Sequence, residues 1–264
     1  MEANSVKIKM YWLNDNHFKD YRPLEGEKYI PCYKDGFVEQ DVEENAIALL
    51  REPRSIQDRV LKYMESHYEK FKYVFTHDSR LLSVLPNAKP IIWAGVWHWS
   101  DVEKDFNHPI SIVAPELAQT PLKQMRKQIA LDLEDTIDCF GTYKGGKWAE
   151  CPEYLDKYPY SIAMENYIDD LWFTEKICNC FANNVVPIYV GSNKIGDFFN
   201  ADGIIQVSSR TEIETMIDYL IEHGREDYFS RLEAIKDNRE RVKRYEKFET
   251  WFMNEYGELL RGLL

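Results

Sequence analysis

The sequence predicts an α/β protein built from two doubly wound domains with parallel sheets. Short apolar runs rich in β-branched and aromatic residues alternate with amphipathic stretches along the chain, which is the order typical of parallel sheets. About nine strand candidates are present, more than one compact sheet of a 264-residue chain requires. Hydrophobic residues make up 44% of the chain and charged residues 30%, so a sizeable core can form.

The expected elements follow the chain in that alternating order. Amphipathic periodicity predicts helices at residues 56–70, 122–134, 174–183 and 212–223. Strands are expected at residues 7–13, 46–50, 73–76, 90–94, 110–114, 136–140, 160–164, 185–190 and 204–207. The adjacent Gly145 and Gly146 do not stand between a strand and a helix, so a simple turn explains them better than a phosphate-binding loop.

A polar connector divides the two predicted domains. Residues 100–109 are polar and end in Asn-His-Pro, a sequence typical of a loop. This places an N-terminal domain at residues 1–108 and a C-terminal domain at residues 109–238. The remaining residues, 239–264, are expected to form a helix that packs back on the N-terminal domain. An apolar stripe for that packing is supplied by Tyr245, Phe248, Trp251 and Phe252.

Net charge and cysteine content limit the possible classes of protein. The formal net charge is −12, which argues against broad binding of polyanions such as nucleic acid and leaves only a local basic cleft for them. The five cysteines are odd in number and irregularly spaced, as expected of reduced core thiols. No signal peptide opens the chain and no stretch is long enough to span a membrane, so we expect a cytoplasmic protein.

The segment from residue 158 to residue 192 carries the residues best suited to chemistry. A strand delivers Glu165 and Asn166 at its carboxyl end, and Thr174 can cap a helix whose first turn holds Glu175 and Lys176. Ligands of open α/β sheets bind at the carboxyl ends of strands, close to helix N-termini. These side chains, together with Trp172, are therefore expected to converge on a nucleotide diphosphate.

Each residue type suits that task. A lysine in a first helical turn adds a full charge to the partial positive charge of the helix end, and the two together would stabilise a diphosphate. A carboxylate can accept hydrogen bonds from two sugar hydroxyls, and an aromatic ring can stack on a base or a ribose. The structural alternative is that Glu175 only complements the helix end and that Lys176 is solvated.

The segment resembles the donor-binding signature of glycosyltransferase family 10, the α1,3-fucosyltransferases. The resemblance covers roughly residues 122–238. Its motifs in this chain are Met164-Glu165-Asn166, Trp172, Thr174-Glu175-Lys176 and Val186-Pro187-Ile188-Tyr189-Val190-Gly191. It implies a GT-B fold, in which two Rossmann-like domains face a central cleft. Trp172 replaces the tyrosine usual in the family, which keeps the ring and removes the hydroxyl.

The resemblance also suggests a phosphate-binding arginine and a catalytic base. Arg126 stands where the family has a basic residue that pairs with the donor phosphates, and a planar guanidinium suits that contact. Glu52 follows the strand expected at residues 46–50, where the family has an acid within a Gly-Glu-Asn motif. Arg51 and Pro53 replace the glycine and the asparagine. Other acids and bases that compete for this role are Asp78, Asp101, His77 and His98.

By this resemblance the chain is an inverting glycosyltransferase that moves fucose from GDP-fucose to a hydroxyl of a glycan. Two alternatives remain open: another donor such as a UDP-pentose with a different acceptor, modified DNA bases included, and a non-catalytic nucleotide- or sugar-binding module. No metal or other cofactor is expected, because side chains supply the positive charge and the nucleotide sugar is a co-substrate. The Asp169-Asp170 pair lacks the intervening residue of a metal-binding DxD motif.

Overall fold

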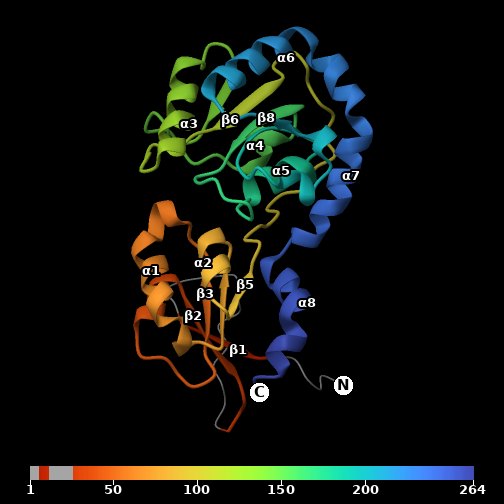
Figure 1. Ribbon diagram of the computed structural model, residues 1–264. Coiled ribbons are helices and arrows are strands. Elements are labelled where there is room, and N and C mark those ends of the chain that lie inside the picture. The colour runs from red at the N-terminus through yellow and green to blue at the C-terminus, as the bar shows by residue number, and fades with distance from the viewer. Residues whose placement is uncertain (1–5, 12–25) are drawn as a thin grey trace. The chain divides into compact units, whose positions relative to one another are not determined.

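The computed structural model describes residues 6–11 and 26–264, whose contacts form two compact units. Unit 1 comprises Met1–Trp93 and Lys247–Leu264, and unit 2 comprises Ala94–Glu246. Each unit contains one five-stranded sheet in which every strand pair is parallel (Figure 1). The predicted fold class, an α/β protein with two Rossmann-like sheets, is confirmed.

In unit 1 the strands lie side by side in chain order. The sheet contains β1 (Ile8–Tyr11), β2 (Ile30–Lys34), β3 (Ile47–Leu50), β4 (Tyr73–Thr76) and β5 (Ala88–Pro90). Every crossover steps in the same direction, so right-handed connections place α1 (Arg54–His67) and α2 (Ser79–Val84) on one face. The C-terminal helix α8 (Phe248–Arg261) covers the other face (Figure 1). Its Phe252 and Tyr256 rings pack on Phe75 at centroid distances of 4.8 and 4.9 Å.

Several element predictions in unit 1 were wrong. Strand β2 was not expected, although its five residues are buried. The strand expected at residues 90–94 ends at Pro90, because β5 pairs with β4 only over Ala88–Pro90. Part of the first expected strand, residues 12 and 13, lies outside the described residues.

In unit 2 the chain reverses its direction across the sheet, whose order is β10-β9-β8-β6-β7. Strand β6 has β7 on one side and β8 on the other, so a topological switch point lies between the carboxyl ends of β6 and β8. The strands are β6 (Ile110–Val113), β7 (Asp138–Phe140), β8 (Tyr160–Met164), β9 (Val186–Val190) and β10 (Ile205–Gln206). The helices are α3 (Pro121–Asp132), α4 (Cys151–Leu155), α5 (Glu175–Ala182), α6 (Arg210–Ser230) and α7 (Leu232–Val242).

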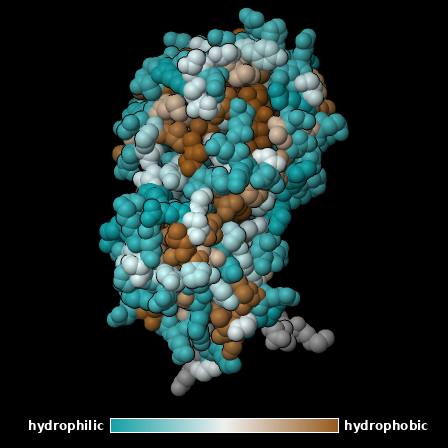
Figure 2. Space-filling model, viewed as in Figure 1, coloured by the Kyte–Doolittle hydropathy of each residue, from teal (hydrophilic) through white to brown (hydrophobic). Residues whose placement is uncertain are grey.

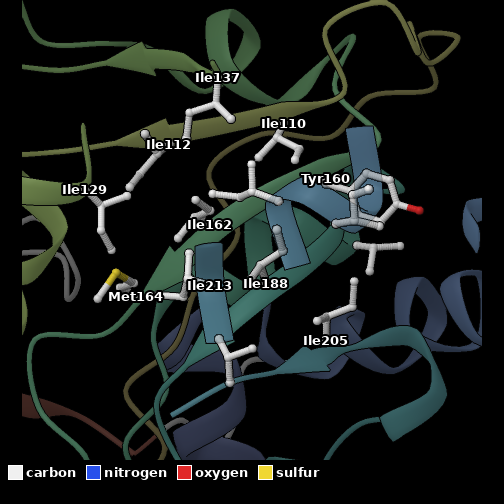
Figure 3. Packing of buried hydrophobic residues seen from close by; sticks show 14 of the residues in the cluster. Ile110, Ile112, Ile129, Ile137, Tyr160, Ile162, Met164, Ile188, Ile205 and Ile213 are labelled. Atoms are coloured by element: carbon white, nitrogen blue, oxygen red, sulfur yellow. The ribbon is translucent and has the colours of Figure 1, made fainter. Parts of the chain in front are cut away.

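Alternate residues of these strands build the core of unit 2. Ile110, Ile162 and Ile188 point to the same side of the sheet and pack with Ile129 of α3 and Ile213 of α6 (Figure 3). Strand residues of the intervening positions, such as Ser161, face the opposite side, where Ser111 donates a hydrogen bond to the backbone of Tyr154 in α4. Successive side chains of a strand point to opposite faces of the sheet, so alternate residues of these strands contact two different layers of helices.

The connector after Trp93 belongs to unit 2, so the contacts divide the chain between residues 93 and 94, not between 108 and 109 as expected. Its backbone is tied to that unit: Trp97 N donates to Asn179 Oδ1 at 2.8 Å, and Asn183 Nδ2 donates to the carbonyl of His98 at 2.9 Å. Lys104 Nζ donates to the carbonyl of Asp156 at 2.7 Å. A polar connector is therefore ordered by hydrogen bonds that sequence composition does not reveal.

Candidate donor-binding site

The site begins where α5 starts, beside the carboxyl end of β8. Thr174 has an extended backbone and caps the helix, with its hydroxyl oxygen 3.5 Å from Lys176 N. A threonine is favoured at this position because its oxygen satisfies an amide that lacks an intrahelical partner. The cap directs Glu175 and Lys176 to the edge of the sheet, as the sequence predicts.

Glu165 lies directly below this helix end. Its side chain has no solvent exposure, and its carboxylate accepts hydrogen bonds from Thr174 N at 2.8 Å and from Thr174 Oγ1 at 2.8 Å. Its own amide donates to Val190 O at 2.8 Å. Glu165 therefore joins β8, β9 and the cap of α5, which is a structural task that the sequence did not indicate.

The glycine that ends the Val-Pro-Ile-Tyr-Val-Gly motif protects this arrangement. A Cβ atom at Gly191 would lie 2.1 Å from Tyr189 Oη and 2.9 Å from Glu165 Cγ. Tyr189 is fully buried and accepts a hydrogen bond from Ser192 N at 3.2 Å. Only glycine leaves space for that hydroxyl, so the motif glycine is explained by packing.

Lys176 is held as an ammonium group between two carboxylates. Its Nζ lies 3.3 Å from Glu165 Oε2 and 3.1 Å from Glu175 Oε1. Burial lowers the pKa of Lys176, but the charges of Glu165 and Glu175 outweigh burial and raise that pKa above its usual value. Burial likewise raises the pKa of Glu175, and the Lys176 ammonium outweighs it and holds the pKa of Glu175 below its usual value. Both groups are thus charged at neutral pH.

Arg126 reaches the same point from α3. Its Nη1 donates to Met164 O at 2.8 Å, and its Nη2 lies 3.4 Å from Asn166 Oδ1. Among the residues that the structure describes, its buried Nε has no hydrogen-bond partner. Burial lowers the pKa of Arg126, yet a guanidinium stays protonated at neutral pH. Among the described residues, Arg126 and Lys176 thus bring two positive charges to the site, and the buried Nε of Arg126 makes no hydrogen bond there.

A pocket opens at this point of unit 2. It extends from the carboxyl ends of β6 and β7 between the sheet and helices α4 and α5, and Figure 2 shows apolar side chains at the surface over β6 and β8. Trp97 and Trp148 line the pocket although they are 59% and 70% exposed. Its polar wall contains Arg126, Thr142, Glu175, Lys176 and Asn179.

Comparison with known protein families identifies the chain. The model of the C-terminal domain of glycosyltransferase family 10 (fucosyltransferase) matches residues 112–250, which is more than half of the chain. The chain belongs to glycosyltransferase family 10. The match takes in α3, α5 and every residue of the pocket wall contributed by these helices.

Relatives of this family 10 chain share little sequence and much of the fold. The alpha-(1,3)-fucosyltransferase FucT of Helicobacter pylori is 29% identical over 68 residues, which are 26% of this chain and 14% of that protein. A crystal structure of alpha1,3-fucosyltransferase with GDP has a TM-score of 0.60 at 14% identity. The match covers 99% of this chain and 92% of the chain in that crystal structure. S. aureus TarM in complex with UDP has a TM-score of 0.59 at 12% identity, with coverage of 88% and 55%. The fold is thus of the GT-B type.

The structure of this family 10 chain brings together most of the predicted donor-binding residues. Arg126, Glu175 and Lys176 line the pocket, whereas Glu165 lies below the helix end and Asn166 beside Arg126. Trp172 is only 4% exposed, and its backbone closes a turn with Asp169. The rings that line the pocket belong to Trp97, Trp148 and Tyr154 instead. The sequence did not assign the stretches that hold the two tryptophans, WAGVWHW and KGGKW, to the site.

Glu52 belongs to unit 1 of the family 10 chain. It follows β3, directly before α1, and its Oε1 pairs with Arg51 Nη2 at 2.7 Å. The competing acid Asp78 is engaged elsewhere, because it caps α2 through Leu81 N and binds Arg54 through both carboxylate oxygens. Asp101 pairs with Arg239 and His98 with Asp156. Within the part of the chain that the structure describes, the ion pair of Glu52 comes from its neighbour Arg51.

Two further properties concern metals and membranes. In residues 6–11 and 26–264, no three His, Cys, Asp or Glu side chains are grouped as metal ligands would be. Asp170, one of the adjacent aspartates, pairs with Lys194 at 2.9 Å. Over the same residues, none of the helices combines the length and the apolar character that crossing a membrane requires.

Proposed function

We propose that this family 10 chain is an inverting glycosyltransferase that transfers a sugar, with fucose from GDP-fucose as the best candidate, to a hydroxyl of a glycan acceptor. One observation carries the proposal: Arg126, Glu175 and Lys176 line a single pocket at the switch point of a parallel sheet. Nucleotides bind at such points in open α/β sheets.

The two cations suit a diphosphate leaving group. Arg126 retains a buried Nε without a hydrogen bond in the described part of the chain, and Lys176 presents an ammonium at the first turn of α5. Fixed positive groups stabilise charge that develops as a leaving group departs. A divalent metal is not required in this scheme, and transfer is expected to proceed in the presence of EDTA.

Other pocket residues suit the remainder of the donor. The Glu175 carboxylate can accept hydrogen bonds from hydroxyls of the sugar or the ribose, and Asn166 lies beside Arg126. The exposed rings of Trp97 and Trp148 offer the stacking surface that the sequence predicts at Trp172. The proposed roles of Glu165 and Trp172 are accordingly structural, since both are buried.

Glu52 is the proposed base. Its carboxylate takes the proton of the acceptor hydroxyl as that oxygen attacks the anomeric carbon. The bond from this carbon to the phosphate oxygen breaks, and the nucleoside diphosphate leaves with the electron pair. Attack opposite the leaving group inverts the anomeric centre.

The experiment that tests this function compares Lys176→Ala and Glu175→Gln with wild type in transfer assays and in calorimetric titrations with GDP. Lys176→Ala is expected to weaken GDP binding about 10–100-fold, because it removes a charge-assisted contact. Lys194→Ala, which removes a surface lysine paired with Asp170 in the same unit, serves as the control. Unchanged turnover in both pocket variants would rule out this site.

A different nucleotide sugar is the second candidate, because the structurally similar TarM and the pneumococcal O-GlcNAc transferase GtfA were both solved with UDP. Thermal-shift titrations with GDP-fucose and with UDP-hexoses and UDP-pentoses separate the two, since the donor that binds the folded state raises Tm. Donor binding without any transfer would favour a non-catalytic module.

A further inference from the structure

An acidic side chain of unit 1 holds the chain segment that carries Glu52. Strands β2 and β3 are parallel neighbours, so Asp35, which follows β2, lies at the same sheet edge as Glu52, which follows β3. Asp35 is 8% exposed and adopts a φ of 46°. Positive φ is uncommon outside glycine and costs free energy, so it persists only where surrounding contacts maintain it.

Those contacts lead directly to Glu52. Asp35 Oδ1 accepts hydrogen bonds from the backbone amides of Arg51 at 2.8 Å and Glu52 at 3.0 Å. A buried carboxylate that binds two successive amides fixes the path of the backbone between β3 and α1. The position of the Glu52 Cα atom is therefore determined by a residue that is distant from it in sequence.

Arg51 contacts the side-chain carboxylate of Glu52. Its Nη2 pairs with Glu52 Oε1 at 2.7 Å, and its Nε lies 3.8 Å from Asp35 Oδ2. The guanidinium also stacks on Trp93, with Cζ 5.2 Å from the ring centroid. Asp35 and Trp93 thus orient Arg51, and Arg51 orients the carboxylate.

We propose that Asp35 and Arg51 are positioning residues for the base Glu52: Asp35 fixes its backbone, and Arg51 fixes its carboxylate. This inference rests on the proposed function of Glu52. Transfer requires the carboxylate to meet the acceptor hydroxyl within hydrogen-bond reach, so a small displacement lowers kcat and leaves donor binding intact.

Asp78 provides a matched control in the same unit. Asp78 is buried, as Asp35 is, and also accepts a backbone amide, that of Leu81, but it caps α2 and pairs with Arg54. A purely structural loss of a buried carboxylate is therefore expected from Asp78→Asn, with a lower Tm and an unchanged kcat.

The experiment measures kcat, the Kd for GDP and Tm for the full chain and for Asp35→Ala, Asp35→Asn, Arg51→Ala, Glu52→Gln and Asp78→Asn. Asp35→Ala and Arg51→Ala are expected to lower kcat by about 10²-fold with an unchanged Kd. Asp35→Asn is expected to retain most of kcat, because its amide oxygen can still accept both backbone amides. If Asp35→Ala does not fold, Arg51→Ala decides, since the Arg51 side chain is 27% exposed.

The outcomes separate the inference from the function on which it rests. Normal kcat in Asp35→Ala and Arg51→Ala, with Glu52→Gln inactive, overturns the positioning roles and leaves the base in place. Normal transfer by Glu52→Gln overturns the base itself and both positioning roles with it. Loss of kcat in Asp78→Asn equal to that in Asp35→Ala also overturns the inference, because any buried carboxylate of unit 1 would then give the same effect.

Discussion

Lys176 Nζ lies 3.3 Å from Oε2 of the fully buried Glu165. The pair joins the carboxyl end of β8 to the first turn of α5, and Thr174 contacts both side chains. The ammonium that faces the pocket is therefore held from below by a carboxylate that does not reach the solvent. Two acids from separate motifs, Glu165 and Glu175, thus pair with the same lysine.

Glu165→Gln is expected to lower the free energy of unfolding by about 1–3 kcal/mol, because the buried network loses the negative charge that pairs with Lys176 and one of its two acceptor oxygens. Urea denaturation measures the change. Glu175→Gln is the comparison, because the Glu175 side chain is 25% exposed. This substitution is expected to lower donor affinity and to reduce the free energy of unfolding by less than Glu165→Gln does. Equal stability of Glu165→Gln and wild type would show that the carboxylate does not support the cap.

Trp148→Ala is expected to weaken GDP binding by about 10–100-fold, the usual value of stacking a base on an aromatic ring. Binding of inorganic pyrophosphate, which has no base, should stay unchanged in the same calorimetric assay. Tyr219→Ala is the control, because Tyr219 is an exposed ring on α6 outside the pocket. A parallel loss of pyrophosphate binding would indicate that Trp148 shapes the pocket and does not stack.

Gly191→Ala is expected to destabilise the protein by about 1–3 kcal/mol, because the added Cβ forces Tyr189 and Glu165 out of place. Thermal and urea denaturation test this. Gly196→Ala is the matched control, since the nearest atom to its Cβ would lie 3.8 Å away, an ordinary contact. A Gly191→Ala protein as stable as the Gly196→Ala protein would contradict the packing explanation of the motif glycine.

Lys34 predicts a pH dependence of stability. Burial lowers the pKa of this amine from 10.5 to about 8, with the Arg51 charge acting in the same direction. Between these two values the unfolded chain binds more protons than the folded one, so the Lys34 contribution to stability rises with pH over that window. Below pH 8 the amine is protonated in both states, so the folded protein bears the full free-energy cost of burying its charge. Lys34→Met is therefore expected to be more stable than wild type at pH 7. Urea denaturation should show this difference shrinking toward pH 10, and a constant difference would refute the effect.

Much of the C-terminal site could be predicted because its determinants are local. Neighbouring residues alone predict the short apolar strand Tyr160–Met164, the cap at Thr174 and the position of Lys176 one residue inside the helix. Glu165 shows where this approach stops. Its residue type suits a sugar ligand, and only the packing of β9 and α5 around it reveals a buried support.

The sequence by itself determined the fold class, the family and the residues at the start of α5, since strand period, helix capping and motif spacing act over short distances. The tertiary structure alone decided which residues share a site. It buried Trp172, brought Trp97 and Trp148 to the pocket and placed Asp35 beneath Glu52. The physical reason is that parallel neighbours are joined by long crossovers, so contacts at the sheet edge depend on strand order, which no local pattern encodes.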